Sequence, residues 1–265
     1  MAAEPIKVVV NGALGKMGRE VVSAVCNEEG LQLVGVVELK ATQKQLQLLD
    51  ASVSVPFSSS LEEIIGKCRP DVIIDFTIAA AAVSASHSAI RHGVNLVIGT
   101  TGLNAVELLE IDRLAREKGV GVIVAANFAL GAVMMMHLAK IAARHFDCAE
   151  IIEQHHEKKA DTPSGTSLTT ARLMLEARNK PFKQPPKPES GESRGKDVEG
   201  VSIHSVRLPG ILARQEVILG AAGQTLSIKH DTVSRECYMP GVMLAAKEVI
   251  RHRGLIRGLD NLLGL

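Results

Sequence analysis

The sequence predicts an α/β protein in which a doubly wound parallel sheet is followed by a second, α+β domain. Through the first half of the chain, short β-branched runs alternate with longer helical patterns, which is typical of a parallel sheet with helices on both faces. The runs VVV (8–10) and VII (72–74) are apolar throughout, as expected for strands buried on both faces. Beyond about residue 127 the alternation ends, which indicates a domain of different architecture.

The first domain is predicted to span residues 1–127. Strands are expected at 6–12, 31–38, 70–77, 95–101 and 120–128, and helices at 16–29, 61–67, 79–92 and 103–118. Because parallel strands need crossover connections, these helices are expected to cover the sheet.

The second domain is predicted to span residues 128–238, with a helix at 131–146, a strand at 149–156, a helix at 166–178 and strands at 201–210, 214–221 and 224–233. The last three strands are predicted to form an antiparallel meander, the final two being joined near Ala222 and Gly223. A closing helix at 240–253, within the segment 239–265, is expected to pack back on the first domain. The Pro-, Gly- and charge-rich stretch 180–200 is either an interdomain linker or a long loop, and the loop is favoured because strands follow at once.

Composition sets further bounds. Of the 265 residues 46% are hydrophobic, and the formal net charge is +1, which indicates a globular protein with a real core and argues against a nucleic-acid partner. The amino-terminal segment lacks the pattern of a signal peptide, and no apolar run reaches the roughly 20 residues of a membrane span. The cysteines are scattered without metal-ligand spacing, so reduced thiols, a cytoplasmic location and no metal site are expected. They are Cys26, Cys68, Cys148 and Cys237.

A glycine turn predicts a dinucleotide site. Gly12, Gly15 and Gly18 follow the first strand and open the first helix, a spacing that permits a tight turn and close approach of the backbone to a pyrophosphate. Glu38 ends the second strand, twenty residues past Gly18, where a carboxylate can hold the adenosine ribose hydroxyls. The arrangement predicts a Rossmann-type domain that binds a nicotinamide dinucleotide.

The choice between NADH and NADPH stays open. Glu38 favours NADH, because a carboxylate repels the 2′-phosphate of NADPH. Lys16 and Lys40 are close enough in sequence to offset that charge.

Two turns are expected to border the nicotinamide. DFT (75–77) ends the third strand and GTTG (99–102) ends the fourth, and ligands of such sheets bind beyond the carboxyl ends of the strands. Asp75 has an equal alternative role as the cap of the following helix.

The run EQHHEKKADTPSGTS (153–167) predicts a site for an anionic molecule. His155 and His156 end a strand, and with an ordinary pKa near ~6.5 either histidine can donate a proton at neutral pH. Lys159 adds positive charge, and the segment 163–166 opens a helix whose hydroxyl and N–H groups can hold a carboxylate. The alternative for Ser-Gly-Thr is a simple helix cap. A serine hydrolase is excluded because no G-x-S-x-G surrounds Ser164.

These motifs resemble the 4-hydroxy-tetrahydrodipicolinate reductase (dihydrodipicolinate reductase) family. The matching stretches are NGALGKMGRE, DFT, GTTG, AANF and EQHHEKKADTPSGT, in order over nearly the whole chain. The resemblance implies NADH- or NADPH-dependent reduction of a cyclic imine dicarboxylate in lysine and diaminopimelate biosynthesis. Leu39 stands where some relatives carry an arginine for the 2′-phosphate, and the segment after Glu38 is short and lacks the Gly/Ser-rich loop of many relatives, which leaves the NADPH preference open.

The resemblance also implies roles for individual residues. His155 would be the general acid, assisted by Lys159, and a homotetramer would form through the sheet of the second domain. Asn127 and Phe128 would form the hinge, with backbone near the cofactor. The residues implied to hold substrate are His156, Lys159, Ser164, Gly165, Thr166 and Arg235. Together with the motifs above, the predicted cofactor residues are Gly12, Gly15, Lys16, Met17, Gly18, Glu38, Lys40, Phe76, Thr77, Gly99, Thr100, Thr101, Asn127 and Phe128.

Two other functions remain as alternatives. A related amino-acid dehydrogenase, acting on aspartate or its semialdehyde, would have the same first domain, and a substrate screen would identify it. A dinucleotide sensor that has lost catalysis would bind NADH without turning over any imine.

Overall fold

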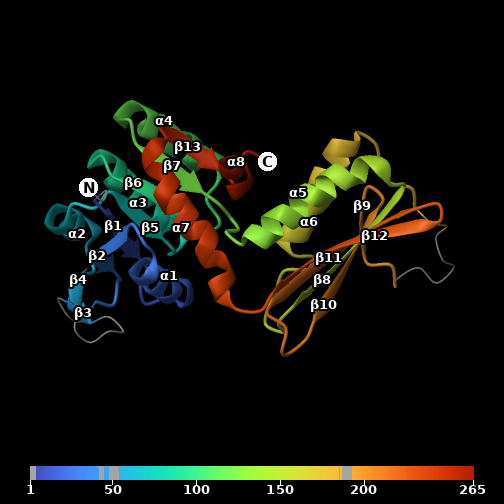
Figure 1. Ribbon diagram of the computed structural model, residues 1–265, viewed down its shortest axis with the longest axis horizontal. Coiled ribbons are helices and arrows are strands. Elements are labelled where there is room, and N and C mark those ends of the chain that lie inside the picture. The colour runs from blue at the N-terminus through green and yellow to red at the C-terminus, as the bar shows by residue number, and fades with distance from the viewer. Residues whose placement is uncertain (1–3, 42–44, 48–53, 185, 187–192) are drawn as a thin grey trace. The chain divides into compact units, whose positions relative to one another are not determined.

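The computed structural model describes residues 4–41, 45–47, 54–184, 186 and 193–265. The chain divides into two compact units, one formed by Met1–Leu130 with Tyr238–Leu265 and the other by Gly131–Cys237. Each has its own sheet (Figure 1). No helix in the described part of the chain is long and apolar enough to cross a membrane.

The first unit is built on an eight-stranded sheet in the order β13-β7-β6-β5-β1-β2-β4-β3. All its strand pairs are parallel except β3–β4. The strands are β1 (Ile6–Asn11), β2 (Leu31–Val37), β3 (Gln45–Gln47), β4 (Ser54–Ser58), β5 (Val72–Asp75), β6 (Asn95–Ile98), β7 (Gly121–Val124) and β13 (Gly254–Arg257).

The helical elements of the first unit cover this sheet. They are α1 (Lys16–Asn27), α2 (Leu61–Cys68), α3 (Ala79–Arg91), α4 (Ala105–Lys118), α7 (Met239–Glu248), the 3-10 turn η3 (Val249–Arg251) and α8 (Leu259–Leu263). Helix α1 packs against α7, and α3 packs against both α2 and α4 (Figure 1). On the α2–α4 side, Ile64, Ala89 and Ile111 contact a core of strand residues that includes Ile73 and Leu96. The doubly wound α/β prediction is therefore confirmed.

The sequence-based prediction missed four short elements of the first unit. Strands β3 and β4 lie in a segment to which no strand was assigned, where Pro56 weakens the strand pattern. The predicted helix 240–253 is too long: α7 ends at Glu248, and after η3 the chain adds β13 parallel to β7, followed by α8. Strand β13 has four residues, too few for a period to be read, and it forms because the sheet edge beside β7 offers partners.

The second unit has a five-stranded sheet in the order β12-β11-β8-β10-β9. Its strands are β8 (Cys148–His155), β9 (Lys196–Val198), β10 (Val201–Arg207), β11 (Ala213–Ala221) and β12 (Gln224–Thr232). Its helical elements are α5 (Leu130–Ala142), η1 (Ala143–His145), α6 (Gly165–Arg178) and η2 (Arg235–Tyr238). Both long helices lie against one face of the sheet (Figure 1).

The predicted three-stranded meander is wrong in part. β11 and β12 form the expected antiparallel hairpin, but β8 lies between β10 and β11 and pairs with β10 in parallel. After β10 the chain crosses the end of β8, where Leu208 N donates to His155 O at 3.0 Å. The stretch 180–200, favoured as a loop, also contains the short strand β9, which pairs with β10. Strand order is a long-range property that the local pattern of each strand does not carry.

The core of the second unit explains which face of β8 turns inward. Ala149 and Ile151 pack with Ala139 and Ala143 of the α5–η1 segment and with Met174 of α6. Residues one position along β8 point to the opposite face and are only partly buried, as the period of two requires. Glu153 and His155 therefore share the helix-facing side of the strand.

Replacing Ile151 with Ala should lower the free energy of unfolding of the second unit by about 2–5 kcal/mol, because the side chain is 0% exposed and its loss leaves a cavity. The matched control is Ile152→Ala, its neighbour on the partly buried face, which should cost less. Chemical denaturation followed by circular dichroism measures both. Equal losses would contradict the assignment of the two faces.

Candidate active site

The glycine turn of the first unit has the geometry of a phosphate cradle. Gly12 has a φ of 81°, which favours glycine, and a Cβ there would lie 2.6 Å from the carbonyl oxygen of Phe76. A Cβ at Gly18 would lie 2.0 Å from the carbonyl oxygen of Gly12, so helix α1 can pack on the turn only with glycine there. Gly15 is the N-cap of α1, no side chain caps the helix, and its first turn has no acidic residue. The first N–H groups of α1 therefore suit an anion.

Beside this turn lies a pocket of about 520 Å³, within the range of about 300–1,000 Å³ usual for small-molecule sites. Five of the predicted cofactor residues line it: Gly12, Gly15, Glu38, Phe76 and Thr77. The Glu38 carboxylate accepts the N–H groups of Leu14 (3.2 Å) and Leu39 (3.0 Å), which holds it beside the glycine turn. These residues fit the ribose and pyrophosphate of a dinucleotide.

The other predicted cofactor residues have different surroundings. Lys16, Lys40 and Thr101 are exposed on the same unit, and Met17 is partly buried. Asn127 Oδ1 accepts the N–H of Ala129 at 2.9 Å. None of these residues lines the pocket in the part of the chain that the structure describes, so their roles stay predictions.

Gly99 and Phe128 both pack against the side chain of Phe76. A Cβ at Gly99 would lie 2.1 Å from the Phe76 ring, and the rings of Phe76 and Phe128 lie 6.0 Å apart between centroids. Gly99 therefore makes room for an aromatic side chain that lines the pocket. Phe128 is buried and packs against Phe76.

Asp75 organises the carboxyl edge of the sheet. It is fully buried at the end of β5, and it accepts hydrogen bonds from Asn11 Nδ2 (2.6 Å), Thr77 Oγ1 (2.8 Å) and Thr100 Oγ1 (2.7 Å). Thr100 Oγ1 in turn accepts the N–H of Thr77 at 2.8 Å. Burial raises the pKa of Asp75, against the lowering effect of these hydrogen bonds. The side chain thus ties three strand ends together, beyond either role weighed from the sequence.

The far end of the pocket was missed by the sequence-based prediction. It is lined by a face of α3 that carries small side chains at helical spacing, with Leu61 and Glu62 of α2 opposite. The small α3 residues are Ala81, Ser84, Ala85 and Ser88, and Arg91 lines the pocket three positions further along the helix. Small residues recurring every three or four positions were the available signal, but such a face is equally typical of close helix packing.

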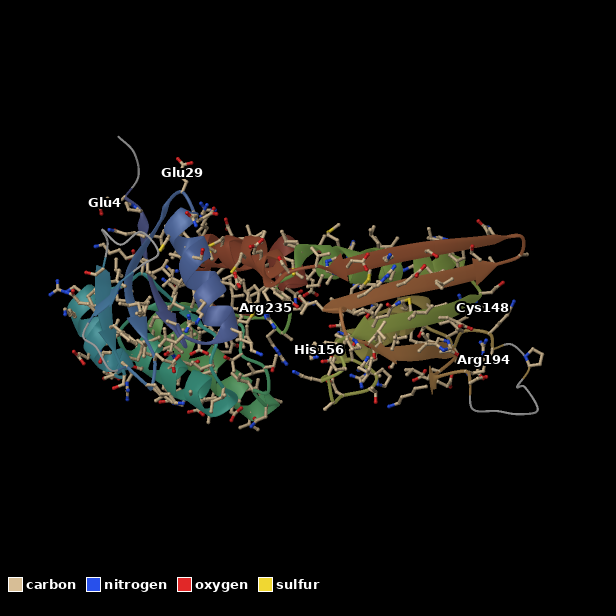
Figure 2. The ribbon with its side chains drawn as sticks, turned by 90° about the horizontal axis from the view of Figure 1, so that it is seen from below. Glu4, Glu29, Cys148, His156, Arg194 and Arg235 are labelled. Carbon is tan, nitrogen blue, oxygen red and sulfur yellow. The ribbon has the colours of Figure 1, made fainter. Side chains whose placement is uncertain are left out.

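The histidine run of the second unit lies where β8 ends. Cys148 begins the strand and His156 follows it, at opposite ends of the sheet (Figure 2). Because β8 ends at His155, the two histidines are not bound by the strict alternation of a strand. Both are partly buried.

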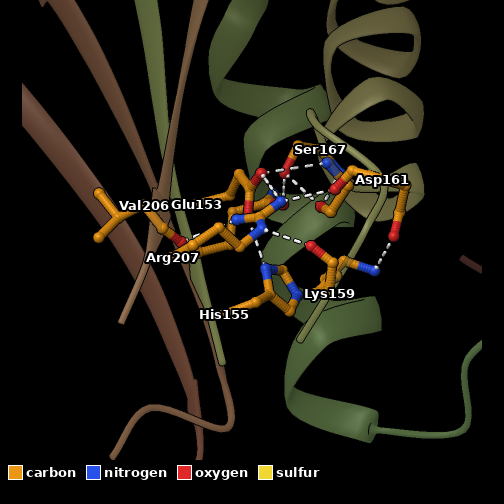
Figure 3. A network of polar contacts seen from close by, with 9 residues as sticks. Glu153, His155, Lys159, Asp161, Ser167, Val206 and Arg207 are labelled. Atoms are coloured by element: carbon orange, nitrogen blue, oxygen red, sulfur yellow. Dashed lines mark hydrogen bonds and ion pairs between the residues drawn. The ribbon is translucent and has the colours of Figure 1, made fainter. Parts of the chain in front are cut away.

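His155 belongs to a network centred on Glu153 (Figure 3). Its Nδ1 lies 2.5 Å from Glu153 Oε2, and the Glu153 carboxylate makes a bidentate ion pair with Arg207, both N–O distances being 2.9 Å. Glu153 Oε1 also accepts the N–H of Ser164 at 3.2 Å. Burial raises the pKa of Glu153, but hydrogen bonds from His155, Arg207 and Ser205 outweigh it and bring the pKa to about 2. Glu153 and Arg207 were not among the predicted site residues.

Lys159 lies in the loop that follows. Its Nζ pairs with Asp161 Oδ1 at 2.8 Å, and this hydrogen bond lowers the pKa of Asp161. Arg207 donates to the carbonyl oxygens of Lys159 (3.3 Å) and Asp161 (2.7 Å). The loop is therefore fastened to the same guanidinium that holds Glu153.

Helix α6 begins at this loop. Ser164 is its N-cap and is 2% exposed, and its Oγ accepts the N–H of Ser167 at 3.2 Å. Ser167 Oγ donates to Gln215 Oε1 at 2.7 Å. The Ser164 hydroxyl is thus already bonded to Ser167 of the same helix, as the helix-cap alternative expects.

Gly165 and Thr166 start α6. Gly165 is exposed, and a Cβ there would meet nothing within 4 Å. Packing therefore does not require glycine at this position, in contrast to Gly12 and Gly18.

Arg235 stands outside this network. It lies on η2, and within the described residues its guanidinium makes no hydrogen bond or ion pair. Its predicted contact with substrate stays a prediction.

The class of protein follows from the first unit. A doubly wound sheet whose glycine turn and Glu38 carboxylate border one pocket is the cofactor half of a nicotinamide-dependent oxidoreductase. The particular family follows from comparison with known proteins. The family model described as "Dihydrodipicolinate reductase, N-terminus" matches residues 6–128, and "Dihydrodipicolinate reductase, C-terminus" matches residues 131–263. The chain therefore belongs to the dihydrodipicolinate reductase family.

Individual relatives align with this chain over nearly their whole lengths. The 4-hydroxy-tetrahydrodipicolinate reductase of Dehalococcoides mccartyi is 53% identical over 98% of this chain and 99% of its own, and that of Moorella thermoacetica is 45% identical over 97% and 98%. Among solved structures, a dipicolinate-bound dihydrodipicolinate reductase from Paenisporosarcina sp. TG-14 has a TM-score of 0.87 and 38% identity, covering 97% of this chain and 99% of that one.

The amino-acid dehydrogenase alternative is not favoured. An aspartate semialdehyde dehydrogenase II from Vibrio cholerae has a TM-score of 0.56 at 13% identity, which shows a shared fold alone. The sensor alternative is not favoured either, because the family matches are named as reductases.

Glu153 should make the stability of the second unit depend on pH. Its pKa is lowered from 4.5 to about 2 on folding, so its contribution is fully present above about pH 4.5 and is lost as the pH falls toward 2, by about 3 kcal/mol. Glu153→Gln should remove this part of the acid dependence. The control Glu150→Gln, on the other face of β8, should retain it. Urea midpoints between pH 2 and 6 measure the effect, and identical slopes for both variants would contradict it.

Proposed function

We propose that this chain reduces 4-hydroxy-tetrahydrodipicolinate, or dihydrodipicolinate, to tetrahydrodipicolinate with NADH or NADPH, in lysine and diaminopimelate biosynthesis. The first unit is the dinucleotide-binding domain, and the second binds substrate. The observation that carries the proposal is that His155 and Ser164, the N-cap of α6, both bond to the Glu153 carboxylate, with Lys159 in the loop between them. A proton donor, a fixed cation and a helix N-terminus are what reduction of an imine dicarboxylate needs.

The cofactor supplies a hydride when it is bound. In the first unit, the N-terminus of α1 would hold its phosphates, Glu38 would accept hydrogen bonds from its ribose hydroxyls, and Phe76 and Thr77 would lie on the nicotinamide side of the pocket. In the second unit, His155 gives a proton to the electron-rich carbon or nitrogen that hydride addition leaves. A proton delivered in this way is worth roughly 10²–10⁴-fold in rate.

The substrate carboxylates are proposed to lie at the start of α6. The N–H groups of Gly165 and Thr166 have no intrahelical acceptor at this end of a helix, and the open space at Gly165 lets a ligand approach the backbone. Lys159, His156 and Arg235 supply positive charge. Ser164 contributes through its cap, because its hydroxyl is already bonded. The dipicolinate in the solved relative is also a dicarboxylate, which supports this class of ligand.

Assembly and location are proposed more broadly. The sheet face opposite α5 and α6 carries the partly buried Ile152 and Ile218 and the exposed Val206, a surface suited to a second copy. A homotetramer formed through this sheet and a cytoplasmic location agree with the family resemblance.

The purified protein should oxidise NADH or NADPH when substrate is generated from pyruvate and aspartate semialdehyde by the preceding synthase, and His155→Gln should lower kcat by about 10²–10⁴-fold with NADH affinity unchanged. The control His204→Gln alters a histidine that pairs with Glu150 and should keep full activity. Absence of oxidation with either cofactor, in protein that binds NADH, would refute the reductase function. Full activity of His155→Gln would refute only the role of that residue.

Gly165→Ala should weaken binding of dipicolinate by about tenfold, about 1.4 kcal/mol, because a methyl group would occupy the space left for the ligand. Stability should not fall, since alanine favours a helix over glycine. Gly66→Ala in α2, where a Cβ also meets nothing within 4 Å, is the matched control and should bind dipicolinate normally. Isothermal titration calorimetry decides, and unchanged affinity in Gly165→Ala would argue against this carboxylate site.

A further inference from the structure

We propose that Glu153, held by Arg207, is a positioning residue that fixes the proton of His155 on Nδ1 and so presents Nε2 as the atom that exchanges a proton with substrate. This inference rests on the proposed function, since His155 is its acid. Neither Glu153 nor Arg207 needs to touch substrate for the effect.

The hydrogen-bond pattern determines the tautomer. Glu153 is 0% exposed, and the low pKa of its carboxyl keeps it ionised at neutral pH. An ionised carboxylate can only accept hydrogen bonds. Since Glu153 Oε2 lies 2.5 Å from His155 Nδ1, Nδ1 must be the donor. In the neutral ring Nε2 then lacks a proton, and in the protonated ring Nε2 carries the proton that can leave.

The carboxylate has no freedom to rotate away from this contact. Oε1 receives the N–H of Ser164 and one Arg207 nitrogen, and Oε2 receives His155 and the other Arg207 nitrogen. Bidentate arginine pairing fixes both the position and the plane of a carboxylate. The imidazole is therefore oriented by a group whose own position is fixed from three sides.

Arg207 also balances the charge. An uncompensated carboxylate beside an imidazole stabilises the protonated ring and makes it a poorer proton donor. In the network drawn in Figure 3, Lys159 and its partner Asp161 also carry charge. The β11 residue that pairs with His155 is Ala213, which does not ionise. Because Arg207 neutralises Glu153, the carboxylate orients the imidazole of His155 without making the protonated ring a poorer proton donor.

The same strand supplies a matched control. Glu150, three residues earlier on the opposite face of β8, contacts Nε2 of His204 at 2.9 Å and pairs with Arg194. Glu150→Gln thus breaks a carboxylate–histidine–arginine set of similar make-up that does not include His155.

The direct test is nitrogen NMR of the imidazole rings in the substrate-free protein, with His155→Gln used to assign the signals. In the unmodified protein, neutral His155 should show a protonated Nδ1 and a bare Nε2. Glu153→Gln should mix the two tautomers, because an amide can donate as well as accept. A bare Nδ1 in the unmodified protein overturns the proposal without any variant having to fold, and without any activity being measured.

The kinetic test separates positioning from structure. Glu153→Gln should lower kcat about 10²-fold with the Kd for NADH unchanged. Arg207→Met leaves the Glu153 carboxylate without its neutralising partner, and the bare carboxylate stabilises the protonated imidazole of His155. The fall of kcat/KM at the alkaline side of the pH profile should therefore move to higher pH. Glu150→Gln should change neither quantity. If Glu153→Gln and Glu150→Gln lower kcat alike, with unchanged profile and tautomer, the role is structural and the proposal fails. An inactive unmodified protein with the expected tautomer would instead refute the proposed function.

Discussion

A carboxylate can be buried only if hydrogen-bond donors surround it, and each unit of this protein is arranged around one such carboxylate at the end of a central strand. Asp75 ends β5 and accepts hydrogen bonds from Asn11, Thr77 and Thr100. Glu153, near the end of β8, accepts hydrogen bonds from His155, Ser164 and Arg207. Leaving a buried ion unpaired costs about 3–5 kcal/mol. The loops that supply donors are therefore held close to the strand ends, where ligands of such sheets bind.

The two carboxylates differ because their partners differ. Among the described residues, the donors that bond to Asp75 are neutral, and burial raises its pKa. Glu153 has a guanidinium as partner, and its pKa falls to about 2 in spite of burial. Asp75 therefore links strand ends through hydrogen bonds, while Glu153 remains an anion that can hold a proton on the facing nitrogen of a neighbouring histidine.

Glycines show the same division between scaffold and site. At Gly12, Gly18 and Gly99 a side chain would collide with backbone or with the Phe76 ring, so the fold itself requires glycine there. At Gly165 the space is open. Packing does not need this glycine, and it starts the helix that the proposed function assigns to a carboxylate.

The sequence by itself determined the local features: the alternating strands and helices, the glycine turn with Glu38, and the run that ends β8 and opens α6. Each depends on spacing within a few residues, which period and propensity record directly. Tertiary structure decided the rest. It placed β8 between β10 and β11, added β13 to the sheet edge, and brought Arg207 to Glu153 across 54 positions of sequence. These pairings depend on which strand ends meet in space, and no local pattern encodes that.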